Sequence, residues 1–77
     1  MKKLSLTILK SGKKGKIIEV AGGAALQGKL MSMGIYPGKD IVKLSHFALR
    51  GPVMIKAGRT TVALGHSMAS KIIVEAE

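Results

Sequence analysis

The sequence predicts a mainly β fold with some helix: a small, partly open barrel of about five strands. A short helix follows the first core strand, and a helical turn precedes the last strand. The chain has 77 residues, enough for a single domain (1–77) and too few for a two-sheet sandwich. It divides into short β-branched runs separated by glycine and proline. Because closing a small sheet hides its edges, an SH3-like barrel is the most economical arrangement.

The first half of the chain contains a strand and the one longer helix. The run "KIIEV" (16–20) is β-branched and is followed by two glycines at 22–23, which predicts the first core strand. Leu26, Leu30 and Met33 recur at i, i+4 and i+7. This spacing places them on one face and predicts a helix from Leu26 to Met33.

A sharp corner follows the helix. Gly34 comes just after the last periodic residue, where a left-handed helix cap is needed. In "YPGK" (36–39), Pro37 presets the second position of a type II turn and Gly38 supplies the positive φ of the third. The corner holds no obvious nucleophile, so we interpret it as scaffold.

The second half predicts a hairpin and a last strand. The segment 39–47 alternates imperfectly and predicts a strand. A loop (48–51) leads to Gly51 and Pro52, and Pro52 opens a further strand, where its missing N–H is tolerated. We expect a hairpin between 53 and 64, one helical turn within 65–71 with Ser67 as a possible cap, and a strand over 72–77.

The composition excludes several kinds of site. There is no cysteine, which removes disulfides, thiolate catalysis and Cys-based metal sites. The only aromatic residues are Tyr36 and Phe47, so the core must be aliphatic. We expect the methionines (Met31, Met33, Met54 and Met68) to fill gaps in the core rather than bind Cu(I). His46 and His66 are interpreted as solvent-facing or loop-packing residues, because two imidazoles without nearby acids make a poor metal site.

No catalytic arrangement is visible. The acids are Glu19, Asp40, Glu75 and Glu77, and no pair has helical spacing. The serines lack a nucleophile-elbow context, and "GKKGK" lacks the spacing and the Ser or Thr of a P-loop. We therefore expect a protein that is not an enzyme and needs no cofactor.

The net charge of +9 concerns partners rather than fold. Six lysines precede the first acid, Glu19. An acidic membrane face, an acidic protein surface, nucleic acid and plain solvent all remain open as what this segment faces. The sharpest alternative function is a KOW-like nucleic-acid-binding module, in which Lys10, Lys13, Lys14 and Lys16 would meet phosphates. Neither aromatic residue is interleaved with these lysines, although single-stranded nucleic acid usually needs stacking.

No segment has the roughly 20 apolar residues of a membrane span, so we expect a cytoplasmic protein.

From about Leu4 to Val74 the order of these signals resembles the FeoA family. The matching segments are "LTILKSGKKGKIIEV", "GG", "LQGKLMSMGIYPGKDIVKL", "GPVMIKAGRTTVALG" and "MASKIIVE". The corner "MGIYPG" is the most specific of them. The resemblance implies a small SH3-like accessory protein of ferrous-iron uptake. It also implies a partner, FeoB, a membrane permease with a cytoplasmic GTP-binding domain. Labels given to the family often mention transition metals, but this chain offers no ligand set for one.

Two places are predicted to contact such a partner. One is the helix edge, with Lys29 and Tyr36, while Leu26, Leu30 and Met33 are expected to cover the open end of the barrel. The other is the loop "HFALRG", where Phe47 and Arg50 are residue types enriched at binding hot spots.

Overall fold

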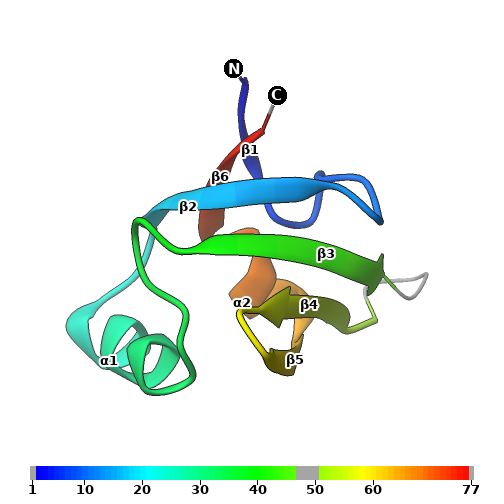
Figure 1. Ribbon diagram of the computed structural model, residues 1–77. Coiled ribbons are helices and arrows are strands. Elements are labelled where there is room, and N and C mark those ends of the chain that lie inside the picture. The colour runs from blue at the N-terminus through cyan, green and yellow to red at the C-terminus, as the bar shows by residue number, and fades with distance from the viewer. Residues whose placement is uncertain (1, 47–50, 77) are drawn as a thin grey trace.

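The computed structural model describes residues 2–46 and 51–76, which form one small sheet with a helix standing beside it (Figure 1). In chain order the elements are β1 (Lys2–Ser5), β2 (Lys14–Val20), α1 (Ala24–Ser32), β3 (Asp40–His46), β4 (Val53–Ala57), β5 (Thr60–Leu64), α2 (His66–Ser70) and β6 (Ile72–Ala76). The expected mainly β fold is confirmed, with a helix after the first core strand and a helical turn before the last strand. No helix in the described part of the chain has the length and hydrophobicity needed to span a membrane.

The six strands form an antiparallel sheet in the order β1-β6-β2-β3-β4-β5. The sheet does not close, so β1 and β5 are its two edges. The prediction of about five strands is therefore too low by one, because β1 has no alternating pattern to reveal it. Pairing with the far end of the chain creates this strand: Lys2 lies opposite Ala76, and Leu4 lies opposite Val74.

Irregular pairing explains the imperfect alternation predicted for β3. The register between β3 and β4 shifts between Lys43 and Ser45. A bulge of this kind bends the strand and re-aims its side chains. Lys43 precedes this shift and lies opposite Ile55, on the same buried face as Ile41, so regular alternation buries it while the apolar Leu44 is 43% exposed. The shift that follows places His46 opposite the buried Val53.

The core is aliphatic, as the composition predicts. Its largest fully buried apolar side chains come from the loop after β1, the helix corner and the strands: Leu6, Ile17, Leu30, Ile35, Ile41, Ile55, Leu64, Ile72, Val53 and Val74. Gly15 lies against this core, because a Cβ built there would lie 3.2 Å from Val74 Cβ.

The corner after α1 has the geometry that the sequence predicts. Gly34 has φ +84°, and its N–H donates to the carbonyl of Met31 at 3.0 Å. The N–H of Ile35 donates to the carbonyl of Leu30 at 2.9 Å, which completes a Schellman motif. The following turn is closed by Lys39 N–H and the Tyr36 carbonyl at 3.1 Å, with Gly38 at φ +98°. These bonds fix the direction in which the chain leaves the helix.

The ends of the helices differ from the prediction in detail. Helix α1 spans Ala24–Ser32 rather than 26–33. The cap of α2 is Gly65, and no side chain caps this helix. Ser67 therefore lies inside the helix, and its predicted capping role is wrong. The β4–β5 hairpin is confirmed, with a tight turn in which Gly58 has φ +65°.

Candidate partner-binding surface

Helix α1 touches the rest of the molecule through few side chains. Leu30 is its only buried residue and Leu26 is half-buried, which supports the predicted covering role of this face. Gln27 ties the helix to the segment before it, because its Nε2 donates to the Gly22 carbonyl at 3.0 Å. Leu30 and the corner residue Ile35 then fix the other end, with exposures of 0% and 1%. A short helix is thus held at both ends while most of its surface faces solvent.

The exposed side of this helix corner combines one cation with two large apolar groups. Lys29 lies exposed in the last turn of α1, where a cation favourably faces the negative end of the helix dipole. Tyr36, at the start of the turn, is 38% exposed. Met31 lies between them in sequence and is 61% exposed. We call these three exposed residues the helix-corner surface; Lys29 and Met31, two positions apart in α1, project to different sides of the helix.

Met31 corrects the expectation that the methionines pack in the core. Met33 and Met68 do pack against the core, and Met54 is half-buried. Met31 lies off the Leu26–Leu30–Met33 face and therefore points away from the sheet. The helical spacing alone was sufficient to show this, because Met31 follows Leu30 directly and adjacent helical residues lie on different faces. Methionine is enriched at protein interfaces, so this residue joins Lys29 and Tyr36 as a candidate contact.

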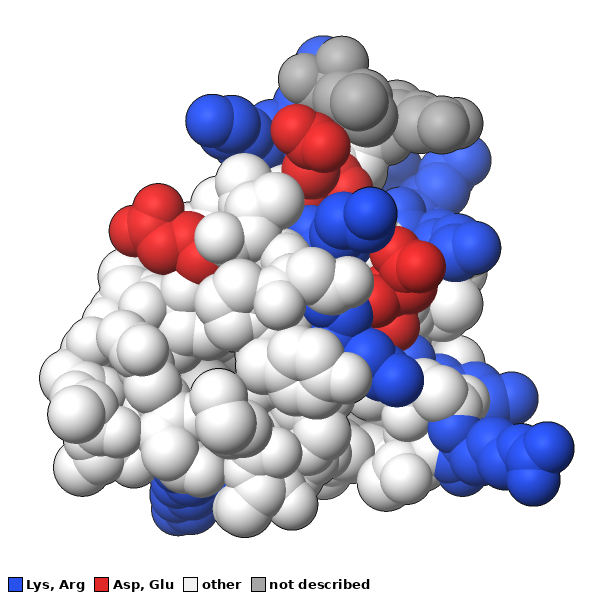
Figure 2. Space-filling model, turned by 60° about the vertical axis from the view of Figure 1, so that its left-hand side comes forward, with Lys and Arg blue, Asp and Glu red and all other residues white. Residues whose placement is uncertain are grey.

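Few charges lie on the face of the molecule that carries α1. When the side that carries α1 is turned forward, a wide area is free of lysine, arginine, aspartate and glutamate (Figure 2). Lysine and arginine side chains gather mainly at one edge of that view. A largely uncharged face with an exposed tyrosine and an exposed methionine carries residue types that are enriched at protein interfaces.

The second predicted contact, with Phe47 and Arg50, lies outside the described residues. It stays a prediction. The lysines of the alternative nucleic-acid function (Lys10, Lys13, Lys14 and Lys16) are all exposed, at the edge of a hollow away from α1.

A buried lysine and two histidines form a separate cluster at the end of β3. Lys43 is 2% exposed, and its Nζ donates to the Thr7 carbonyl at 3.1 Å and lies 3.3 Å from His46 Nδ1. Burial lowers the pKa of Lys43 below its ordinary value. The rings of His46 and His66 pack together, with centroids 5.6 Å apart and planes tilted by 30°. The cluster ties the loop after β1 to β3 and α2.

This cluster lacks the donors of a metal site. His66 Nδ1 is buried and has no hydrogen-bond partner among the residues that the structure describes, but the charged group beside its neighbour His46 is Lys43, which repels a cation. Within residues 2–46 and 51–76, no three His, Asp or Glu side chains are grouped so that they could hold a metal ion. Zinc sites need three or four such ligands. The geometry therefore suits packing better than ligation.

Comparison with known proteins shows which family and which solved structures this chain resembles. A family model described as the FeoA domain matches residues 4–76. A crystal structure of an iron uptake regulatory protein (FeoA) has 30% identity and a TM-score of 0.88, covering 100% of both chains. The solution structure of a FeoA-like protein from Clostridium acetobutylicum has 25% identity and a TM-score of 0.84, covering 99% of this chain and 88% of that one.

A more distant similarity concerns the fold alone. A manganese-dependent transcriptional repressor has 20% identity and a TM-score of 0.88, covering 97% of this chain but 42% of the repressor. A search of curated proteins found no match.

Proposed function

The chain belongs to the FeoA domain family, which implies a role in ferrous-iron transport, and within that role we propose that it is a non-enzymatic adaptor. Its proposed partner is the cytoplasmic GTP-binding part of a FeoB-type permease, and it would act on the cytoplasmic side of the membrane. The observation that carries the proposal is the helix-corner surface, formed by Lys29, Met31 and Tyr36 on a helix fixed at both ends.

Rigidity is what suits this surface to an adaptor. Ordering a flexible segment on binding costs about 0.5–1.5 kcal/mol for each immobilised side chain, and preorganisation reduces that cost. The Schellman motif at Gly34 and the turn at Gly38 set the backbone before any partner arrives. Side chains on this backbone therefore keep more of their contact energy as affinity.

The absence of a catalytic arrangement supports the non-enzymatic part of the proposal. Among the described residues, Asp40 and Glu19 are exposed single carboxylates, and the histidines pack against each other beside a lysine. General acid–base chemistry needs two positioned titratable groups around a substrate. Asp40 and Glu75 line the same hollow, but exposed lysines surround them there.

Binding of the soluble GTP-binding part of a FeoB-type permease, measured by calorimetry with wild-type and variant protein, tests the proposal. Lys29→Ala and Tyr36→Ala are each expected to weaken binding about tenfold, as hot-spot truncations do. Lys10→Ala is the matched control, because this exposed lysine lies away from α1 and should bind as the wild type does. Equal affinities for all four proteins would remove the basis for naming the helix-corner surface.

The alternative function makes a different prediction in the same experiment. A nucleic-acid-binding module would bind short RNA or DNA saturably at physiological salt and lose affinity in Lys10→Ala. It would also show no binding to the GTP-binding domain of the permease. In the described residues the exposed aromatic ring of Tyr36 does not line the lysine-rich hollow, which disfavours stacking of bases there.

A further inference from the structure

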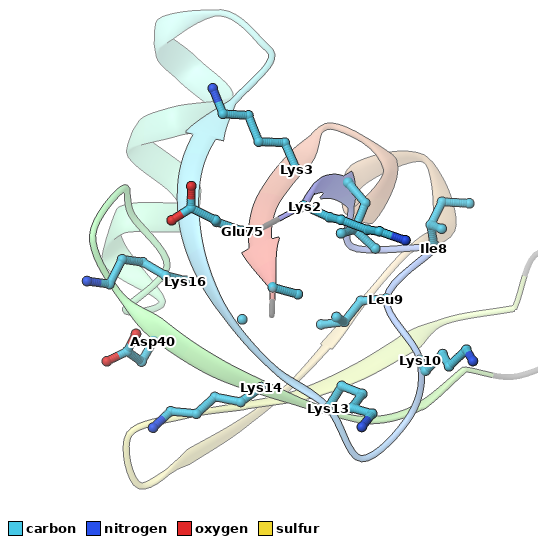
Figure 3. Close-up of a pocket in the computed structure, with 13 residues that line it drawn as sticks. Lys2, Lys3, Ile8, Leu9, Lys10, Lys13, Lys14, Lys16, Asp40 and Glu75 are labelled. Atoms are coloured by element: carbon cyan, nitrogen blue, oxygen red, sulfur yellow. The ribbon is translucent and has the colours of Figure 1, made fainter.

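A wide hollow lies away from α1, between the loop that joins β1 to β2 and the paired ends of β1 and β6 (Figure 3). Its volume is about 1170 Å³. We call it the basic hollow, because lysines surround it: Lys2, Lys3, Lys10, Lys13, Lys14 and Lys16. These lysines come from two strands and a loop that the sheet topology brings together.

The charges of the basic hollow are strongly unbalanced. Asp40 and Glu75 also line it, so the six lysines leave an excess of four positive charges. All six lysines are exposed. The ammonium groups of Lys3, Lys10, Lys14 and Lys16 point away from one another around the rim (Figure 3). A small anion would need these groups to converge, whereas diverging groups fit an extended anionic surface.

Ile8 is an exposed apolar side chain at the rim of this hollow. Its side chain is 68% exposed, although it is large and branched. The turn that carries it is closed on Ser5, whose carbonyl accepts from the N–H of Ile8 at 2.9 Å and from that of Leu9 at 3.2 Å. Leu9, only 3% exposed, anchors the same turn in the core. The fold therefore holds an isoleucine outward among lysines.

The combination of six lysines with an exposed isoleucine distinguishes between the possible partners of the basic hollow. Protein interfaces are depleted in lysine, so a surface with six lysines is unlike one. A phosphate backbone offers nothing for an exposed isoleucine, and no aromatic side chain lines the described hollow for stacking. A bilayer of anionic lipid offers both requirements, phosphate charge for lysine and acyl chains just beneath it for an apolar side chain.

We propose that the basic hollow is a docking surface for anionic phospholipid, in which the ring of lysines meets headgroup phosphates and Ile8 enters the headgroup–acyl boundary. The surface is separate from the helix-corner surface and does not depend on the proposed partner. In combination, the two would leave α1 free for a protein while the lysines hold the molecule at the bilayer.

Flotation with lipid vesicles tests this proposal on the full chain. The probes are vesicles of phosphatidylcholine alone and vesicles in which phosphatidylglycerol replaces part of it. We expect binding only with the anionic lipid, and we expect it to decline as salt rises. A Lys10→Gln/Lys13→Gln/Lys14→Gln variant should bind roughly a hundredfold more weakly. Ile8→Ser should lose about tenfold.

The control has the same net charge as the triple lysine variant. Lys56→Gln/Arg59→Gln/Lys71→Gln removes three exposed cations that do not line the hollow. It should retain most of the vesicle binding. Equal losses in the two triple variants would show that only net charge matters, which overturns the proposal. Failure of the wild type to bind anionic vesicles would do the same.

Fluorescence checks the role of Ile8 directly. The chain has no tryptophan, so Ile8→Trp reports from one position. Its emission should shift to the blue with anionic vesicles, while Met31→Trp, on the helix-corner surface, should not respond. Blue shifts at Met31→Trp alone would place the membrane contact on the wrong face. Tighter, Ile8-independent binding to duplex DNA than to vesicles would favour nucleic acid and contradict the lipid assignment.

Discussion

Gly34, at the corner after α1, and Gly28, inside α1, should respond to alanine in opposite directions. Gly34 has φ +84°, and a Cβ added there would meet no atom within 4 Å. The cost of Gly34→Ala is therefore one of backbone conformation, about 1–2 kcal/mol for an L-residue in the left-handed region. Alanine also reduces the entropy of the unfolded chain, which offsets part of that cost. We expect a net loss of about 1 kcal/mol.

Gly28 provides the matched case within the same helix. It is exposed, lies inside α1 and likewise has no atom within 4 Å of a built Cβ. Its φ is not in the left-handed region, so alanine should stabilise the helix by about 1 kcal/mol. The two substitutions add the same methyl group, and only the backbone conformation differs.

Thermal unfolding followed by circular dichroism measures both variants. For a domain of this size, 1 kcal/mol shifts Tm by about 4–8 °C. Gly34→Ala should lower Tm by that amount, and Gly28→Ala should raise it by a similar one. Shifts of the same sign, or no loss in Gly34→Ala, would refute the argument that a left-handed cap fixes this corner.

The remaining predictions concern the core, the buried lysine and the exposed isoleucine. Leu30→Ala should lower the free energy of unfolding by about 2–5 kcal/mol in urea, because Leu30 is fully buried; a loss below 1 kcal/mol would mean that α1 is not anchored there. The lowered pKa of Lys43 means that the unfolded chain binds this proton more tightly than the folded one. The free energy of unfolding should therefore rise with pH between the folded pKa and the ordinary value of 10.5. The rise is measured as the difference between the free energies of unfolding of wild type and Lys43→Met. Parallel pH profiles for the two proteins would contradict this. Ile8→Ser should change the free energy of unfolding by no more than about 0.5 kcal/mol, since the side chain is 68% exposed; a larger loss would show a role in folding.

The corner was predictable because its signals are local. Gly34 and Gly38 need positive φ, and Pro37 fixes its own φ, so three positions within five residues specify the corner almost independently of the rest. The hairpin turn at Gly58 is a similar case. The helix face of Leu26 and Leu30 followed from spacing in the same way.

The features that sequence reasoning missed depend on distant segments. Strand β1 forms because Leu4 pairs with Val74, some seventy positions along the chain, and its own four residues, with two lysines and one leucine, show no strand pattern. Alternation puts Lys43 on the buried face of Ile41, but the acceptor for its Nζ is the Thr7 carbonyl, far away in the sequence. That acceptor cannot be derived from residues 40–46. The basic hollow likewise appears only when the topology joins its three segments.

Chemical-shift mapping of the labelled protein against the GTP-binding domain of a FeoB-type permease tests the central claim most directly. The adaptor proposal predicts saturable shifts that centre on Lys29, Met31 and Tyr36, with Lys10 to Lys16 unchanged. Shifts confined to Lys10 to Lys16, or no shifts at saturating concentrations of the domain, would contradict it.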